Sequence, residues 1–543
     1  MKSLVTHHSS VIIMINPYDE VPYPNYAYSY THPDTLATLA TLLSLSPAPV
    51  DRCRVLELGC ASGGNLIPMA QTLPDSEFVG LDYSGQQIAA GRAAISALDL
   101  GNVTLKQLDI RDIDTHTLGE FDYIIVHGIF SWVPPDVQAA IFETCRRNLA
   151  PNGVAYVSYN TYPGWHMLSA IREMMLYHTR DVSEPAMKAA QARALLDFLV
   201  DSIPAENNPH GSLLGAYGGF LQLEMNRMKT NTDNYLLHDE LEDVNEPIYF
   251  YQFAERAAQH GLQYLTEVDF NTVLPISFPP PVSANLFKLA RDVIEMEQYM
   301  DFLRNRTFRK TLLVHADVSV NRTLRPDRLM GLYLASRAQA VSDQPDLTSL
   351  NVEKFRSADG ATLSTDHPVT KVAMTHLRAV WPQAIHFNDL LIAARTQLGL
   401  DLSPEKSALD AQALAANLLK AYAYSSNLIE LHVQPARFTT EVSDRPIASP
   451  WARLQADEPG QITNLRHERV ELDEMGRFLL RHLDGTRDRA ALFDSVAKPL
   501  REGTLVVRQN DQPVEDPAQA EAILAEELDT NLQWLAHAAL LVA

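Results

Sequence analysis

The stretch Val55–Asn65, with the sequence VLELGCASGGN, constrains the fold of this chain more than any other. It opens with a short apolar run of the kind that forms a buried strand. Small residues follow at once, and helical spacing begins at Asn65. Residues without bulk let the backbone approach a ligand closely, and the first turn of a helix presents unpaired N–H groups. The stretch therefore predicts a nucleotide-type pocket between a strand and a helix.

Acidic residues end the first three predicted strands of this region: Glu57, Asp82 and Asp109. An acid after the second strand accepts hydrogen bonds from ribose hydroxyls, and an acid after the third can bind an adenine amino group. A NAD-binding domain shares the first two features but usually carries G-x-G-x-x-G, whereas this turn reads G-C-A-S-G-G. S-Adenosylmethionine has no pyrophosphate to neutralise, and Glu57 suits its amino group. The pattern therefore favours S-adenosylmethionine as the ligand.

Strands and helices alternate in the first third of the chain, which predicts an α/β fold with a parallel sheet covered on both faces. The expected strands are 54–58, 77–81, 103–108, 123–126 and 154–159. The expected helices are 65–73, 84–97 and 136–149. A later helix and two strands, which complete a seven-stranded Rossmann-like sheet, are expected at 247–260, 262–270 and 309–316.

Beyond Asn321 the pattern changes to short helices and β-hairpins, which predicts two winged-helix-like α+β modules joined by a Pro- and Asp-rich linker at 443–459. We expect an S-adenosylmethionine-binding core in residues 16–163 and a helical insertion, a candidate homodimer contact, in 164–233. A regulatory region that completes the core sheet is expected in 234–320, with a second helical insertion at 284–305. The middle domain is expected in 321–440 and the C-terminal domain in 441–543.

Composition argues against several partners. The formal net charge of -23 repels phosphate backbones, so we expect no nucleic acid. No apolar run reaches the ~20 residues of a membrane span, and the N-terminal segment lacks the features of a signal peptide. Either Met1 or Met14 is the translation start. Three cysteines without a CxxC pair indicate neither a disulfide framework nor a metal site, so we expect a reducing, cytoplasmic setting.

Four segments, LELGCASGG, FVGLDYS, QLDI and FDYIIVHG, resemble motifs I to IV of class I S-adenosylmethionine-dependent methyltransferases. Longer segments, including HGIFSWVP, YNTYPGWHMLSAIREMM and LLHDELEDVNEPIYFYQF, resemble the bacterial protein-lysine methyltransferases that carry a methyltransferase regulatory domain. Rickettsial enzymes that act on outer-membrane proteins typify this family. The resemblance covers most of the chain and is weakest after Ala340. It implies S-adenosylmethionine as the methyl donor and a protein with an accessible lysine as the substrate.

The resemblance also implies the roles of individual residues in donor binding. It assigns the methionine moiety to Glu57, Gly59 and Gly63, the ribose to Asp82, the adenine to Tyr83, Asp109 and Ile110, and the sulfonium to His127. Ala61 replaces the middle glycine of the common E-x-G-x-G-x-G motif and is small enough for binding to survive. The predicted donor site also includes Asn65 and Gln87 at the starts of two helices.

Methyl transfer requires alignment of the nucleophile, and aromatic rings suit both a cationic sulfonium and an incoming ammonium. The candidate catalytic residues are therefore His127, Trp132, Tyr30 and Tyr159. Tyr30 belongs to a Tyr- and Pro-rich segment, 16–30, which is predicted to be extended and either packs as a surface strap or covers the pocket. His238 and Asp239 either approach the same rim or only cap a helix.

Two other functions stay open at the level of sequence. One is a methyltransferase for a small molecule. The other is a DNA-binding regulator that senses S-adenosylmethionine without catalysis. The candidate recognition helix of such a regulator, DAQALAANLLKAYAYSS, carries one lysine and no arginine, which is poor material for phosphate contacts.

Overall fold

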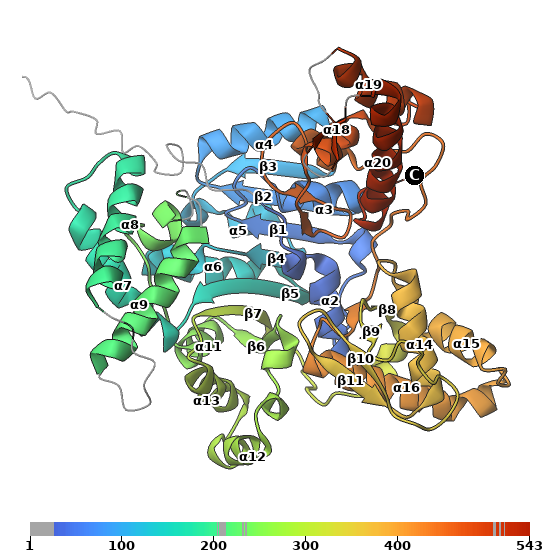
Figure 1. Ribbon diagram of the computed structural model, residues 1–543. Helices are drawn as coiled ribbons and strands as arrows, with labels where there is room; N and C mark the ends of the chain where they lie inside the picture. Colours follow the sequence, from blue (N-terminus) through green and yellow to red (C-terminus); the bar gives the residue numbers. More distant parts are fainter. Residues whose placement is uncertain are drawn as a thin grey trace, which may run out of the picture.

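The computed structural model describes residues 26–203, 205, 213–230, 233, 236–502, 507–509, 512–514 and 516–542. A seven-stranded sheet with the strand order β3-β2-β1-β4-β5-β7-β6 forms its centre (Figure 1). Strands β1 to β5 pair in parallel, whereas β7 runs antiparallel to both of its neighbours. The α/β sheet predicted from the sequence is confirmed, including the two late strands that complete it.

The sheet is built from segments far apart in the sequence. Its strands are β1 (Arg54–Leu58), β2 (Glu77–Asp82), β3 (Val103–Gln107), β4 (Phe121–Val126), β5 (Leu149–Asn160), β6 (Leu262–Glu267) and β7 (Phe308–His315). The helices of the core are α2 (Pro33–Leu42), α3 (Leu66–Thr72), α4 (Gly85–Ala97), α5 (Thr115–Leu118), α6 (Pro135–Asn148) and α11 (Phe250–Gln259).

Successive strand residues contribute to two apolar cores, one on each face of the sheet. Val55 packs with residues of α2, α3 and α4 on one face, whereas its neighbour Leu56 packs with residues of α6 and α11 on the other. Side chains of a strand alternate between faces, so a sheet buried on both sides needs apolar residues at consecutive positions. This requirement explains the consecutive apolar residues Val55 and Leu56 that open the Val55–Asn65 stretch.

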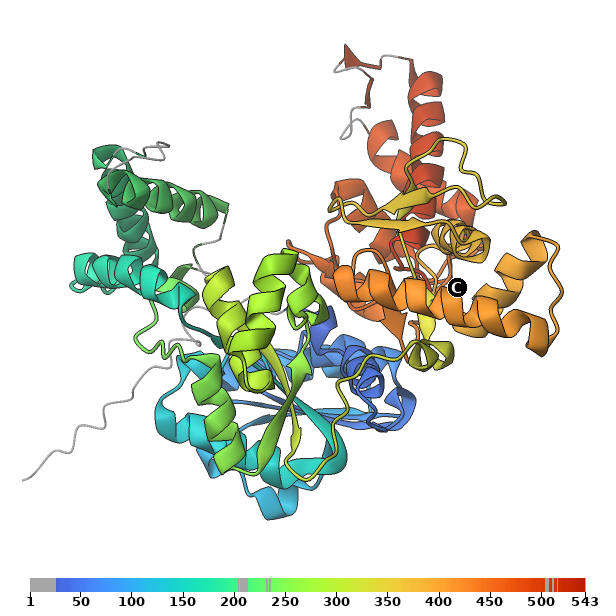
Figure 2. The same cartoon turned by 90° about the horizontal axis from the view of Figure 1, so that it is seen from below.

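Two helical insertions leave the sheet, as predicted. The first comprises α7 (Gly164–Thr179), α8 (Pro185–Ser202) and α9 (Leu213–Thr230), and the second comprises α12 (Pro280–Leu289) and α13 (Val293–Arg304). Helices α7 to α9 have an apolar core of their own and project away from the sheet (Figure 2). They expose large apolar side chains such as Tyr177, Phe198 and Leu223. A homodimer contact through this insertion stays a prediction.

The C-terminal half contains two further α+β regions. The middle region contains η8 (Pro326–Gly331), β8 (Tyr333–Ala335), β9 (Gln339–Ala340), β10 (Glu353–Arg356), β11 (Thr362–Thr365), α14 (Pro368–Val380), β12 (Ile385–His386), α15 (Phe387–Gln397), α16 (Pro404–Tyr424) and β13 (Glu430–His432). The last region contains α17 (Pro450–Gln455), β14 (Ile462–Thr463), β15 (Arg469–Val470), α18 (Glu474–His482), α19 (Arg489–Arg501), β16 (Arg508–Gln509), β17 (Gln512–Pro513) and α20 (Pro517–His537).

Residues 443–459 are not the linker that their composition predicts. They contain α17, whose Ala452 is fully buried, and the Trp451 backbone N–H donates to Gln71 Oε1 in α3 at 2.7 Å. Ser449 caps this helix and Pro450 begins it, and both residue types favour a helix start. The prediction counted Ser and Pro as linker residues and so missed a helix that fastens the C-terminal region to the core.

The described part of the chain has no helix that is long and apolar enough to cross a membrane. Its three cysteines, Cys53, Cys60 and Cys145, are free and buried. Residues 16–25 of the predicted Tyr-rich strap, and both candidate start residues, lie outside the described residues.

Candidate active site

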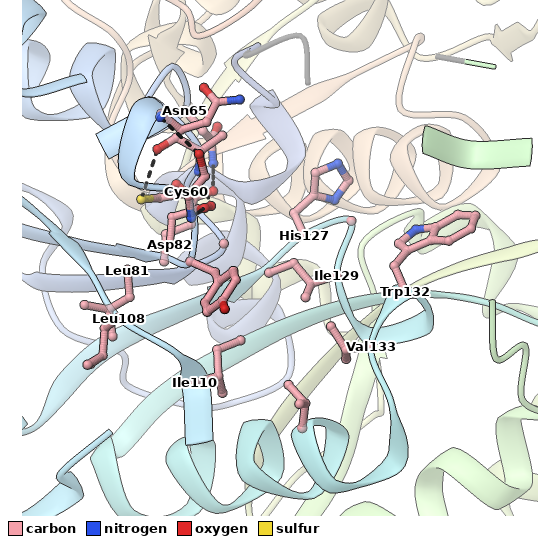
Figure 3. A pocket seen from close by; sticks show the side chains of 18 of the residues that line it. Cys60, Asn65, Leu81, Asp82, Leu108, Ile110, His127, Ile129, Trp132 and Val133 are labelled. Atoms are coloured by element: carbon pink, nitrogen blue, oxygen red, sulfur yellow. Dashed lines mark hydrogen bonds between the residues drawn. The ribbon is translucent and has the colours of Figure 1, made fainter. Parts of the chain in front are cut away.

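A cavity of about 420 Å³ opens where β1, β2 and β4 end, at the carboxyl edge of the parallel strands. This volume is in the usual range of ligand sites, about 300–1,000 Å³. Figure 3 shows Asn65 and Asp82 on one side of the cavity and His127 and Trp132 on the other. The edge is also where open α/β sheets bind their ligands, because the connections diverge there.

The backbone of the turn after β1 forms one wall of the cavity. Gly59 has a φ of +69°, and a Cβ atom there would lie 2.1 Å from the side chain of Ile129. Glycine is therefore required at this position for its conformation and for space. Ala61 also has a positive φ, 48°, and lines the cavity. Gly63 shapes the turn at a φ of +79° but does not itself line the cavity.

Asp82 connects the ends of β1 and β2. Its Oδ2 accepts a hydrogen bond from the Ala61 N–H and its Oδ1 accepts one from the Ser84 N–H, both at 2.8 Å. Asp82 also lines the cavity, where a carboxylate can accept hydrogen bonds from a ligand. Asp82 is thus both the brace of the turn and a candidate acceptor for ligand hydroxyls.

An apolar slot follows Asp82 along the cavity. Ile110 lines it together with Leu81, Leu108, Val133 and Val137, while Tyr83 and Gln87 add polar edges. Asp109 also lines the cavity, but its carboxylate accepts hydrogen bonds from the Arg111 guanidinium, which lowers the pKa of Asp109. The slot offers flat apolar walls with an acid nearby, which is the chemistry that an adenine ring requires.

Glu57 is buried, with 4% of its surface exposed. The side-chain amide of Asn65 donates to Glu57 Oε1 at 2.8 Å, whereas Oε2 has no hydrogen-bond partner among the described residues. Burial raises the pKa of Glu57 to about 8, and the hydrogen bond from Asn65 only partly opposes this rise. A buried carboxylate oxygen without a partner calls for a cationic or N–H donor from a ligand.

His127 stands at the other end of the cavity, held from both sides. Its Nδ1 lies 3.0 Å from the Tyr156 hydroxyl, and its Nε2 lies 3.4 Å from the Tyr30 hydroxyl. The ring of Tyr28 packs on it with a centroid distance of 4.1 Å. Burial is the main cause that lowers the pKa of His127, to about 3, and Lys310 and Arg469 lower it further. The imidazole is therefore neutral at physiological pH.

The predicted catalytic residues occupy different places. Trp132 lines the cavity and makes an edge-to-face contact with Trp165 at 6.3 Å. Tyr30 contacts His127 from behind without lining the cavity itself.

The prediction for Tyr159 is wrong in position. Its ring is stacked on Phe253 at 4.0 Å in the core of the opposite face, and its hydroxyl lies 3.1 Å from Thr311 Oγ1. Neighbouring positions of β5 alternate between faces, and it is Tyr156 that points toward His127. Because β5 is buried on both faces, its sequence carries no signal of which tyrosine faces the cavity.

Other cavity residues were only partly foreseen. Tyr26 and Tyr28 of the Tyr-rich segment line the cavity, as do His238 and Asp239 from the π-helical turn Leu236–Glu240. The sequence had suggested His238 and Asp239 as rim residues, and the Tyr-rich segment as a cover for the pocket. The structure brings both into the lining of the cavity that also contains His127 and Trp132.

S-Adenosylmethionine fits the residues of this cavity. The unpaired Glu57 oxygen suits its ammonium group, Asp82 suits its ribose hydroxyls, and the apolar slot suits its adenine. The cavity therefore has the character of a methyl-donor site at the edge of a class I methyltransferase sheet.

Comparison with known proteins agrees with the fold and the cavity. The methyltransferase domain family matches residues 56–155, and the family described as "Predicted methyltransferase regulatory domain" matches residues 232–315. The family described as "PKMT, C-terminal winged helix domain" matches residues 444–540, so the winged helix expected at the C-terminus is confirmed. The middle region stays a prediction in this respect.

The protein RP789 of Rickettsia prowazekii is 36% identical over 537 residues, which cover 97% of this chain and 94% of that protein. The structure of PKMT2 from Rickettsia typhi in complex with AdoHcy is similar at 30% identity and a TM-score of 0.84. That similarity covers 96% of this chain and 100% of the PKMT2 chain. The chain is thus a class I S-adenosylmethionine-dependent methyltransferase. It belongs to the bacterial family that includes RP789 and PKMT2.

Proposed function

We propose that this methyltransferase transfers methyl groups to lysine side chains of protein substrates. The resemblance of its motifs to protein-lysine methyltransferases and the similarity to PKMT2 along almost the whole chain support a protein substrate. The main structural support comes from the residues that line the cavity beyond those assigned to the donor. There a carboxylate, Asp239, lines the same cavity as the rings of Tyr28, His127 and Trp132.

The donor contributes an activated methyl group on its sulfonium, and the residues of the chain bind and orient it. In our proposal Glu57 accepts a hydrogen bond from the donor ammonium, and Asp82 accepts hydrogen bonds from the ribose. Ile110, Asp109, Tyr83 and Gln87 surround the adenine, while Gly59, Ala61 and Asn65 shape the methionine end. The sulfonium then points toward His127, because that residue lines the far end of the same cavity.

The acceptor end suits a lysine for two reasons. Aromatic faces and a carboxylate attract an ammonium, and a partly desolvated site lowers the pKa of an amine so that it can lose its proton and attack. His127 is neutral, so it adds no positive charge that would repel either the sulfonium or the lysine. An acidic metabolite fits this end less well, because Asp239 repels a carboxylate.

The proposal is tested with methyl-labelled donor and a bacterial lysate. We expect label in protein bands, located on lysine by peptide mass spectrometry. Asp82→Asn should abolish labelling by weakening donor binding, whereas Asp75→Asn, at an exposed acid outside the cavity lining, should label as the wild type does.

A second variant separates acceptor from donor binding. Asp239→Asn should raise the KM for the labelled protein about tenfold and leave donor affinity unchanged, since one charge contact near a partly buried site is worth about 1.4 kcal/mol or more. Asp243→Asn, an exposed acid nearby in sequence, is the matched control. Label found only in small molecules would support the small-molecule alternative and contradict the proposal.

A further inference from the structure

The C-terminal winged-helix domain contacts the donor cavity through the turn between β14 and β15. His467, in this turn, has a left-handed φ of 60° and is 5% exposed. Its Nε2 lies 2.8 Å from Asn65 Oδ1, across 402 positions of sequence. Asn65 in turn donates to the donor-site residue Glu57. A buried chain of hydrogen-bonding groups therefore runs from the winged-helix domain to the carboxylate of the cavity.

The contacts of Asn65 fix the orientation of its amide. The backbone N–H of Tyr28 can only donate, and it lies 3.0 Å from Asn65 Oδ1, so that atom is the amide oxygen. His467 must then carry its proton on Nε2 and donate to the same oxygen. With the oxygen held on that side, the Asn65 NH2 group faces Glu57 Oε1, and Glu57 Oε2 is left for the ligand.

A second residue of the same hairpin supports the cover of the cavity. The Arg469 guanidinium lies 5.2 Å from the ring centroid of Tyr26 and 5.8 Å from that of Tyr28. Cation–π contacts of this kind attract the rings toward the hairpin. Since Tyr26 and Tyr28 line the cavity, the hairpin holds both the methionine end and the Tyr-rich segment in place.

We propose that His467 is a positioning residue of the methyltransferase, which holds Asn65 and thereby presents the free oxygen of Glu57 to the amino group of the donor. The proposal rests on the donor placement given above. It makes the winged-helix domain a structural part of the donor site, in addition to any role in binding partners.

The ionisable groups around Glu57 either stay neutral or shift its pKa in a known direction. Asp82 lies near enough to raise the pKa of Glu57, whereas burial raises the pKa values of Cys60 and Tyr28 and keeps both neutral. His467 itself is neutral, because burial lowers its pKa well below the usual value. The hydrogen bond from Asn65 lowers the pKa of Glu57. A loosened Asn65 should therefore shift the ionisation of Glu57 to higher pH.

The experiment measures binding of S-adenosylhomocysteine to the full-length protein by calorimetry across pH. We expect His467→Ala to weaken binding about five- to tenfold at neutral pH, the usual effect of one lost buried hydrogen bond. The pH at which affinity levels off should also move upward. His467→Gln, which can donate from its amide, should restore much of both properties. His482→Ala changes a histidine of α18 whose side chain donates to the Phe478 carbonyl of the same helix, and it should bind as the wild type does.

Two outcomes would overturn the role of His467. One is wild-type affinity with a wild-type pH profile in His467→Ala. The other is a His467→Gln protein that melts like the wild type but binds as poorly as His467→Ala. Two other outcomes would instead contradict the placement of the donor itself. One is no binding by the wild type, and the other is a Glu57→Gln variant with unchanged affinity and pH profile.

Discussion

At the scale of single residues, burial gives Glu57 two linked properties. It is buried with one oxygen unpaired, and its pKa is raised to about 8. Without a ligand the side chain is therefore largely protonated at neutral pH. An ammonium group placed at Oε2 favours the ionised form, so binding of the donor should expel the proton.

This coupling predicts how donor affinity depends on pH. Affinity for S-adenosylhomocysteine should rise up to tenfold per pH unit between about pH 6 and 8 and then level off, because only ionised Glu57 binds the ammonium well. Calorimetry in two buffers of different ionisation enthalpy should detect release of about one proton per donor at pH ~7. Glu57→Gln should bind more weakly and release none.

The same raised pKa has a consequence for the ligand-free protein. Neutral Glu57 contributes stability that is fully present below its unfolded-state pKa of about 4.5 and is lost as the pH rises through about 8. Donor binding should therefore raise the melting temperature more at pH ~8 than at pH ~6. A donor affinity that is flat over this interval in the wild type would contradict the assignment of Glu57 to the ammonium.

At the scale of secondary-structure elements, a buried charge cluster joins β6, β7 and α13. Arg309 of β7 is fully buried and donates to Glu267 at 2.8 Å, to Asp301 at 2.8 Å and to Glu297 at 3.0 Å. Its guanidinium also lies 3.8 Å from the ring centroid of Phe250 in α11. The cluster holds β6, β7 and the second insertion together. These two strands form the edge of the sheet that the first third of the chain does not contribute.

Removal of the cation should destabilise this part of the sheet strongly. Arg309→Met leaves three buried carboxylates, beside which Arg306 remains and pairs with Asp301 at 3.4 Å. Glu267 keeps hydrogen bonds from the Lys310 N–H and the Thr311 hydroxyl, but these carry no charge. Breaking a buried ion pair from one side typically costs about 3–5 kcal/mol. Chemical denaturation of the full-length protein should show a loss of this size.

The control for this prediction is a pair on the surface. Arg291 and Glu295 pair at the start of α13, where the Arg291 side chain is 86% exposed. Arg291→Ala should leave the free energy of unfolding nearly unchanged, because exposed ion pairs contribute little to stability. Similar losses in the two variants would show that the buried cluster is not a special contributor to stability.

At the scale of the whole molecule, the winged-helix domain is fastened on two sides. His467 bonds to Asn65 in the core, while its neighbour Arg466 donates to Glu430 of β13 at 2.5 Å and to the Pro382 carbonyl at 2.7 Å. The hairpin thus connects the donor site, the middle region and the C-terminal domain. A winged helix held in this way is an integral part of the enzyme.

The charge of the molecule predicts weak binding to DNA. With a formal net charge of -23, the protein should not bind duplex DNA at nanomolar concentration in physiological salt. The candidate recognition helix lies in α16 and has no arginine to contact phosphates. A gel-shift titration with random-sequence duplex tests this expectation. Salt-sensitive binding at nanomolar protein would favour the regulator hypothesis instead.

The sequence by itself determined the order of elements in the core and the chemistry of the donor end. Strand and helix periods, the glycine-containing turn and acids at the strand ends are local signals, and each needs only a few neighbouring residues to act. Glu57, Asp82 and Asp109 could therefore be predicted as one site, to which the family resemblance added Ile110. The two late strands were also predictable, because β6 and β7 carry their own apolar patterns.

Only the tertiary structure decided which side chains meet at the acceptor end. Tyr159 and Tyr156 are equivalent by sequence, but the alternation of a doubly buried strand places just one of them against His127. No local pattern brings Asp239 to the same cavity or His467 to Asn65, since such contacts depend on how distant segments fold onto the sheet. Val55–Asn65 specifies the donor turn, whereas its long-range partners are set by packing across the whole chain.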